Sequence, residues 1–364
     1  MSSFVIPTSV TSINDYAFAS CTALSSIILP PTITVIAQGL FTNSGLQSVS
    51  IPTTVGTIND NAFKGCAALT AVQFNNGVTT LQDNVFSGCT ALTGIILPAN
   101  ITSIGSYLFN GCTALEYAVF NGNISVLPQN CFYNCTSLAS VTLPNSLTTI
   151  NSNAFYNCTS LTSLVIPKNV TSISSGSLHG CSALTSLTIP IIGGRALTSE
   201  DSSEGSDTVF GYIFGTSSYD GSTAVSQKYK SGSTRTYYIP SSLQRIYIQP
   251  ASSYTFKTYI PYGSFSNCTM ITYIDCTYPP TAIRPQAFVG CTNLTSIPLT
   301  SATSIEEAAF KNDTNLFKQA TLNLPNISYL GIEAFFGTGP ANIKLGTNLT
   351  TIPDSCFAMC QYLN

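Results

Sequence analysis

Apolar and polar positions repeat along the chain with a period of about 23 residues, within the range of leucine-rich repeats. One copy is residues 138–160, LASVTLPNSLTTINSNAFYNCTS. Its first half alternates apolar and polar residues up to Pro144, as a half-buried strand does. Its second half ends in Phe155 and Cys158 and is too short and too rich in Ser, Thr and Asn for a regular helix. We therefore predict a parallel sheet built from the first halves, with the second halves returning as short extended or 3₁₀ segments.

A phenylalanine marks each coil of this repeat. The marker positions are Phe18, Phe41, Phe63, Phe86, Phe109, Phe132 and Phe155, with Leu178 in the eighth place, followed by Phe265, Phe288, Phe310, Phe335 and Phe357. The gap between the two series divides the chain. We predict about eight coils in residues 1–190, a widened coil with two insertion loops in 191–260, and about five coils in 261–364.

Both ends of the chain fall inside the repeat. Residues 4–7, FVIP, match the tail of a strand unit, and Leu363 would begin another one. Solenoids normally end in polar capping repeats. We therefore expect an excised piece of a longer protein, whose secretion signal or anchor is missing here. The first 20 residues lack the basic and apolar regions of a signal peptide, and no apolar run approaches the length of a membrane span.

Charge and titratable residues are scarce. Charged residues make up 7% of the chain and the net charge is −3, which gives no electrostatic case for binding nucleic acid or an anionic membrane. His179 is the single histidine, next to Leu178 at a repeat corner, where a surface or corner role is favoured over general-base catalysis. No Ser-His-Asp or Cys-His set is apparent. We therefore predict no enzymatic activity, no cofactor and no metal site.

The full unit, L-x-x-I-x-L-P-x-x-L-x-x-I-x-x-x-A-F-x-x-C, resembles the BspA-like (Treponema-type) leucine-rich repeat over about residues 4–190 and 260–363. The resemblance implies a right-handed, curved solenoid on a bacterial or protist cell surface, with a role in adhesion. It implies neither catalytic residues nor a shared binding motif. We expect a cell-surface or secreted module that binds a protein or glycan on another cell or in the extracellular matrix. The alternative is a passive spacer or stalk within a larger surface protein.

Most of the 13 cysteines follow the repeat register. Ten stand three positions after the coil phenylalanine or its substitute: Cys21, Cys66, Cys89, Cys112, Cys135, Cys158, Cys181, Cys268, Cys291 and Cys360. We predict a buried column of free thiols that act as small hydrophobic side chains. Disulfides along this column are possible by distance but need a specific torsion at every step. Two C-F-x-x-C pairs, Cys131/Cys135 and Cys356/Cys360, do not have zinc-site spacing.

The interruption at 191–260 differs in composition from the coils. It holds 11 of the 27 charged residues, and 11 of the 18 tyrosines lie between Tyr212 and Tyr278. Residues 210–214 are predicted to replace the Ala-Phe corner, and Leu243, Ile246 and Ile248 to rebuild a strand unit. Long loops on a rigid scaffold often carry function. A solvated excursion typical of the family is the other interpretation.

An acidic run lies in the first of these loops, at Glu200, Asp201, Glu204 and Asp207. Its carboxylates are hard oxygen ligands, so a calcium site is conceivable, but their order does not match an EF-hand loop. We favour a mobile charged loop.

Tyrosines and charged residues stand out on the predicted outer face of the strands, where small side chains predominate. In most coils these positions hold Ser, Thr or small apolar residues. The exceptions are Glu116 and Tyr117 in one coil, Arg245 and Tyr247 in the widened coil, and Tyr273 and Asp275 in the following coil. Tyr and Arg are enriched in binding hot spots. We predict that Arg245, Tyr247, Tyr273 and Asp275, roofed by the insertion, form the preferred partner site; ordinary drift between repeats is the alternative.

Overall fold

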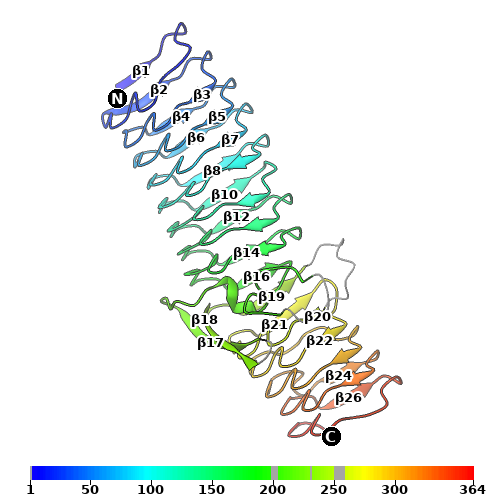
Figure 1. Ribbon diagram of the computed structural model, residues 1–364. Coiled ribbons are helices and arrows are strands. Elements are labelled where there is room, and N and C mark those ends of the chain that lie inside the picture. Colours follow the sequence, from blue (N-terminus) through cyan, green and yellow to red (C-terminus); the bar gives the residue numbers. More distant parts are fainter. Residues whose placement is uncertain (1, 198–203, 230–231, 250–258) are drawn as a thin grey trace. The chain divides into compact units, whose positions relative to one another are not determined.

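The computed structural model describes residues 2–197, 204–229, 232–249 and 259–364. Short β-strands and tight turns make up nearly all of this structure (Figure 1). The described part contains no helix with the length and hydrophobicity needed to cross a membrane. The predicted mainly β, leucine-rich repeat solenoid with parallel strands is confirmed.

Contacts divide the chain into two compact units. The first comprises Met1–Val170 and Gly176–Leu184, and the second comprises Thr171–Ser175 and Thr185–Asn364. Within each unit the coils stack, and strands of successive coils pair in parallel in short sheets of two to four strands, as β8 does with β10 and β19 with β21. Each unit therefore has its own apolar core, enclosed between two rows of strands.

The first unit has a long-strand row and a short-strand row. The long strands are β1 (Ser2–Val5), β2 (Leu24–Ile28), β4 (Ser48–Ser50), β6 (Ala71–Gln73), β8 (Gly94–Leu97), β10 (Tyr117–Phe120), β12 (Ser140–Thr142) and β14 (Ser163–Val165). The short ones are β3 (Val35–Ile36), β5 (Thr57–Ile58), β7 (Thr80–Leu81), β9 (Ser103–Ile104), β11 (Val126–Leu127) and β13 (Thr149–Ile150). The predicted extended return segments are thus two-residue strands.

The second unit repeats both rows and adds a hairpin. Its long strands are β16 (Ser186–Ile189), β19 (Arg245–Ile248), β21 (Tyr273–Cys276), β24 (Thr321–Leu324) and β26 (Asn342–Leu345). The short strands are β15 (Ser172–Ile173), β20 (Tyr259–Ile260), β22 (Ala282–Ile283), β23 (Ser304–Ile305) and β25 (Tyr329–Leu330). The insertion adds the 3₁₀ helix η1 (Phe210–Ile213) and two antiparallel strands, β17 (Ser222–Lys228) and β18 (Thr234–Pro240).

Each coil turns its corner through two residues with left-handed backbone, one two positions before the phenylalanine and one two positions after it. At the second of these positions the φ angle is 58° at Asn134, 56° at Asn157 and 79° at Gly180. Asn and Gly tolerate this conformation best. A Cβ on Gly180 would also lie 2.2 Å from Asn157 Oδ1. The left-handed backbone at this position therefore explains why Asn or Gly precedes the cysteine in the recurring Asn-Cys-Thr and Gly-Cys motifs.

The marker phenylalanines form a stack in each unit that is buried except at the end rings, Phe18 and Phe357. From Phe18 to Phe155, successive ring centroids lie 5.4–5.8 Å apart with nearly parallel planes. From Phe265 to Phe357 the spacing is 5.1–5.6 Å. Offset stacking of this kind contributes beyond the burial of apolar area. The phenylalanine that each coil places in its core thus also stacks on the phenylalanine of the next coil.

The cysteines line the core beside this stack as free thiols. Among the described residues, eight thiols donate to the carbonyl oxygen of the phenylalanine one coil earlier, for example Cys112 Sγ to Phe86 O at 3.1 Å and Cys135 Sγ to Phe109 O at 3.1 Å. Burial raises the pKa of Cys112 to about 12, so the thiol stays protonated and can donate. The predicted buried column is confirmed for eight of its ten cysteines; Cys21 is exposed and Cys360 is half-buried.

Asp313 replaces cysteine at this position in one coil. It is fully buried; Oδ1 accepts the Cys291 N–H at 2.7 Å, whereas Oδ2 is a buried oxygen for which the described residues supply no partner. Burial raises the pKa of Asp313 well above its ordinary value. Because the folded pKa lies above the unfolded value of roughly 3.9, the stability contribution of this group is fully present below pH 4 and is lost as pH rises toward the folded pKa.

We therefore expect the substitution Asp313→Cys to stabilise the protein at pH 7 and to have little effect at pH 3.5. The thiol would restore the column, with Phe288 supplying the acceptor, and would remove a buried carboxyl without a full set of partners. The expected gain at pH 7 is about 1–3 kcal/mol, measured by chemical unfolding at both pH values under reducing conditions. The exposed Asp354→Asn serves as the control. A gain confined to pH 3.5 would contradict the assignment.

Candidate functional site

The predicted residues of the second unit lie on two adjacent strands. β19 pairs in parallel with β21 so that Arg245 is opposite Tyr273 and Tyr247 is opposite Asp275. The alternating Ile246 and Ile274 are buried, which leaves the other four side chains on the outer face. The structure thus brings Arg245, Tyr247, Tyr273 and Asp275 together. We call these four residues the β19–β21 patch.

The aromatic rings of the patch touch each other diagonally. The centroids of Tyr247 and Tyr273 are 6.1 Å apart with an interplanar angle of 60°, within the range for tilted aromatic pairs. Asp275 is the main cause of a raised pKa at the exposed Tyr273 phenol, an effect that Arg245 opposes. The phenol therefore stays protonated at physiological pH and can donate a hydrogen bond. Asp275 Oδ1 itself accepts the Cys276 N–H at 2.8 Å, which orients the carboxylate.

Glu116 and Tyr117 belong to the first unit and are described separately. The Tyr117 ring covers Gly94 on the neighbouring β8, where an added Cβ would lie 2.2 Å from Tyr117 Cζ. The ring nevertheless keeps 43% exposure. Glu116 donates its N–H to Thr93 O at 2.8 Å, and its carbonyl accepts the Ala139 N–H at 2.9 Å, which continues the ladder between coils. Tyr117 compensates for a missing side chain as well as presenting an aromatic surface.

The insertion rebuilds one coil, as the apolar spacing predicts. Phe210 in η1 packs on Phe265 with centroids 5.0 Å apart, so it takes the marker position. β19 pairs with β16 on one side and β21 on the other, which confirms the strand unit around Leu243, Ile246 and Ile248. Much of the second predicted loop is instead the β17–β18 hairpin. Its signal in the sequence is a pair of seven-residue segments, STAVSQK and TRTYYIP, on either side of a Gly-containing turn.

Two buried side chains fasten this hairpin to the core. Gln227 Oε1 accepts the Gly211 N–H at 2.6 Å, and its Nε2 donates to Ser264 O at 2.8 Å and to Cys268 Sγ at 3.4 Å. Tyr237 is fully buried, and its hydroxyl donates to Ser206 O at 2.8 Å. An added Cβ on Gly211 would lie 2.5 Å from Tyr237 Cβ, so this close approach requires glycine. The hairpin is thus part of the folded core.

The acidic run does not behave as a mobile charged loop where the structure describes it. Glu204 is buried, and its Oε2 accepts the Tyr262 N–H at 2.8 Å. Asp207 forms an ion pair with Arg195 at 2.7 Å. Burial requires such partners, because an unpaired carboxylate there would be costly. Glu200 and Asp201 lie outside the described residues, and the described part holds no cluster of three or more metal-ligating side chains.

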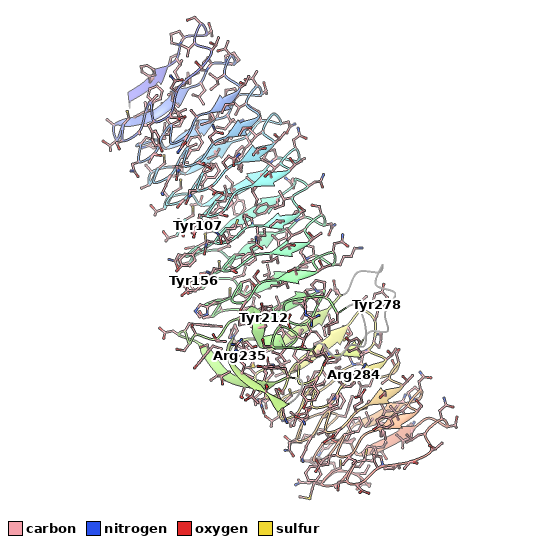
Figure 2. All side chains as sticks on the ribbon, in the orientation of Figure 1. Tyr107, Tyr156, Tyr212, Arg235, Tyr278 and Arg284 are labelled. Atoms are coloured by element: carbon pink, nitrogen blue, oxygen red, sulfur yellow. The ribbon has the colours of Figure 1, made fainter. Side chains whose placement is uncertain are left out.

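His179 lies at a corner, but it is buried rather than on the surface. Its ring stacks on Tyr156 at 4.7 Å between centroids, and Tyr156 stacks on Tyr133 at 4.5 Å. Figure 2 shows Tyr107 and Tyr156 on the same flank of the first unit. The expected corner position of His179 is correct, whereas a surface position is wrong. The ring is covered because Tyr133, Tyr156 and His179 occupy the same position in successive coils and stack on one another. His179 is thus a member of an aromatic ladder.

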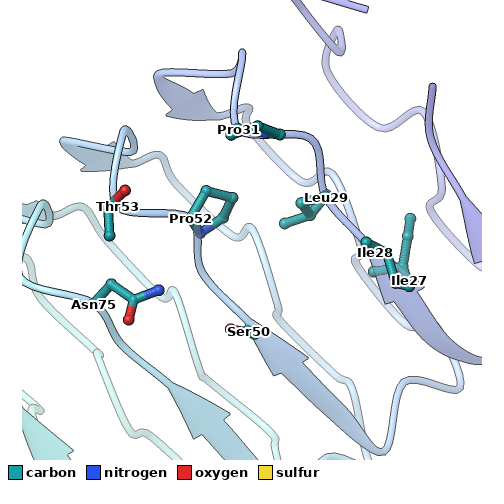
Figure 3. A pocket seen from close by; sticks show the side chains of 8 residues that line it. All are labelled: Ile27, Ile28, Leu29, Pro31, Ser50, Pro52, Thr53 and Asn75. Atoms are coloured by element: carbon teal, nitrogen blue, oxygen red, sulfur yellow. The ribbon is translucent and has the colours of Figure 1, made fainter. Parts of the chain in front are cut away.

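A shallow hollow of about 320 Å³ lies across three early coils of the first unit (Figure 3). Ile28, Pro52 and Asn75 are among its lining residues, none of which is ionisable. Asn75 Nδ2 already donates to Ile51 O at 2.6 Å. The hollow therefore presents a mostly apolar surface, and its lining holds no acid or base beside the hydroxyls of Ser50 and Thr53.

Comparison with protein families identifies the repeat. The family model of the BspA type leucine rich repeat region matches six copies, over residues 1–116, 102–199 and 234–364. No curated protein matches the sequence.

Among solved structures, a leucine rich cell surface protein from Faecalibacterium prausnitzii is 24% identical, with a TM-score of 0.44; the match covers 100% of this chain and 86% of that one. A leucine-rich repeat protein from Bacteroides ovatus is 22% identical, with a TM-score of 0.48 and coverage of 92% and 84%. The pneumococcal vaccine antigen PcpA is 18% identical, with a TM-score of 0.37 and coverage of 83% and 78%. By the family model and by its coil geometry, the chain belongs to the BspA-type leucine-rich repeat family.

Proposed function

We propose that this chain is a surface recognition module that binds a protein through the β19–β21 patch. The observation that carries the proposal is the convergence of Arg245, Tyr247, Tyr273 and Asp275 on two paired strands. Equivalent positions on β12 are Ser140 and Thr142. A solenoid supplies a rigid, extended surface on which such a cluster is preorganised.

The chemistry of the patch favours a polar protein surface as the partner. Arg245 supplies a planar cation, Asp275 a carboxylate and the two tyrosines amphipathic rings, which is the composition of interface hot spots. A cell-surface or secreted location agrees with this role, and Glu116 and Tyr117 are a second, separate candidate contact in the first unit. Adhesion to a host or neighbouring cell is the corresponding biological role. A passive spacer is the competing function, since most strand positions carry Ser and Thr.

The double substitution Tyr247→Ser with Tyr273→Ser is expected to abolish partner binding while leaving the unfolding midpoint nearly unchanged. Both rings lie on the outer face, and Tyr273 is 36% exposed, so their removal opens no core cavity. Retention on immobilised matrix proteins, mucins and epithelial cells at physiological salt measures the effect. Tyr329→Ser, an exposed tyrosine elsewhere in the same unit, is the matched control.

Binding that survives the double substitution would refute the patch as the partner site. If neither the unsubstituted protein nor the double variant binds, the spacer function is supported. Binding only to mucin that is lost on deglycosylation would replace the protein partner with a glycan. Point substitutions are preferable to replacing residues 191–240 with a linker, because that deletion would remove Phe210, Gln227 and Tyr237 from the core.

A further inference from the structure

The β17–β18 hairpin has an outer edge whose hydrogen-bonding groups can be identified residue by residue. The two strands pair without a bulge from Ser222 opposite Pro240 to Lys228 opposite Thr234. At one end of the ladder, the Tyr229 N–H donates to Ser233 O at 3.0 Å. Antiparallel pairs alternate between bonded and non-bonded residues. The main-chain groups of Thr234, Thr236 and Tyr238 therefore point away from β17.

Most of this edge of β18 is unpaired. The Tyr238 N–H donates to Gly215 O at 3.1 Å, but the N–H and C=O groups of Thr234 and Thr236 have no partner among the described residues. Both threonines are also exposed. The opposite edge is partly covered, since Ser226 O accepts from Asn267 Nδ2 at 2.7 Å and the Lys228 N–H donates to Ser266 Oγ at 3.3 Å. Only on β18 do two successive outward residues, Thr234 and Thr236, keep both main-chain groups without a partner among the described residues.

Exposed edges in soluble proteins are usually blocked by proline, bulges or a covering segment. In the part of the chain that the structure describes, β18 has none of these devices between Thr234 and Tyr238, and its only proline, Pro240, ends the strand. The edge is also held rigid, because Gln227 and Tyr237 fasten both strands to the core. A partner strand would therefore meet a template that needs no ordering on binding.

We propose that the β18 edge is a second interaction surface, which takes an extended, acidic polypeptide segment of a partner by β-strand addition. A strand is the ligand whose alternating C=O and N–H groups match those of Thr234 and Thr236. The charge follows from the sequence of the hairpin: residues 222–240 contain three Lys or Arg and no Asp or Glu, in a chain of net charge −3. On the hairpin, Arg235 is exposed between the two threonines (Figure 2).

The test uses two synthetic ten-residue peptides, one alternating Thr and Glu and the other alternating Thr and Lys. Backbone amide exchange of the intact chain is followed by NMR with each peptide at physiological salt. The Thr-Glu peptide is expected to slow exchange at the amides of Thr234 and Thr236 at least tenfold, and the Thr-Lys peptide to leave it unchanged. Equal protection by both peptides, or by neither, would overturn the proposal. If the amides of Thr234 and Thr236 are protected without peptide in a self-associated form of the protein, the proposal is also overturned. The strand bound at the β18 edge would then belong to a second copy of this chain.

Thr236→Pro provides an independent check by removing one edge N–H. The pairing with β17 should persist, since the Thr236 N–H points outward. We expect at least a tenfold loss of Thr-Glu peptide affinity, with Ala224→Pro on the outward side of β17 as the matched control. Full affinity in Thr236→Pro would overturn the proposal. The double tyrosine variant of the β19–β21 patch should retain the peptide, so the two sites can fail separately.

Discussion

Replacing Phe109 with alanine is expected to lower the free energy of unfolding by about 3–5 kcal/mol. The ring is fully buried and stacks on Phe86 at 5.8 Å and on Phe132 at 5.4 Å, so the truncation removes two aromatic contacts and leaves a cavity in mid-stack. The neighbouring coils cannot collapse into this space without breaking their strand pairing, because backbone hydrogen bonds fix the distance between coils. Urea unfolding followed by circular dichroism measures the loss.

The control is Phe109→Leu, which the protein itself supplies in another coil. Leu178 occupies the marker position of the eighth coil and is fully buried there. We therefore expect the leucine variant to lose clearly less stability than the alanine variant. Equal losses would show that stacking geometry dominates, and a loss below about 1 kcal/mol in the alanine variant would contradict the role of the stack as the core of the coil.

The repeat could be read from the sequence because one physical constraint recurs in every coil. Each marker position is buried against the same position of its neighbours, so apolar identity there survives across copies, as Phe63 and Phe155 illustrate. The same holds for the cysteine position, where a small side chain with a weak donor fits the space. Asp313 was not predicted as a buried carboxyl, because its residue type favours the surface even though the register of its coil places it at the cysteine position.

The candidate site was partly predictable. Arg245 and Tyr273 were recognisable as outliers because strand alternation assigns them to the outer face, and register places them opposite each other. The hairpin was not predicted, because its two strands bury residues that look polar in sequence. Gln227 and Tyr237 enter the core only because Gly211, Ser264 and Ser206 supply hydrogen-bond partners from distant positions in the sequence. The spacing of apolar residues cannot predict hydrogen-bond partners that are distant in the sequence.

Replacing Gln227 with leucine is expected to destabilise the second unit by about 2–4 kcal/mol. Leucine is of similar size, so the loss comes from polar groups rather than from a cavity. The Gly211 N–H would lose its acceptor inside the core, and the donors to Ser264 O and Cys268 Sγ would disappear. Leaving a buried donor unsatisfied costs roughly 1–3 kcal/mol, and each lost hydrogen bond adds to it. Thermal unfolding and amide exchange in β17 and β18 measure the effect.

Gln73→Leu is the matched control, because Gln73 lies at an exposed strand position in the first unit and should tolerate the change. If Gln227→Leu leaves both stability and hairpin exchange unchanged, the side chain does not fasten the hairpin.

The Gln227→Leu variant also distinguishes the rigidity of the hairpin from the hydrogen-bonding groups of its edge as causes of peptide binding. Thr236→Pro should weaken peptide binding without destabilising the hairpin, whereas Gln227→Leu should weaken it by releasing the hairpin, with faster exchange at the inward-bonded amides of Val225 and Tyr237. A hairpin that binds the Thr-Glu peptide equally well after this release would show that the core attachment is not what preorganises the edge.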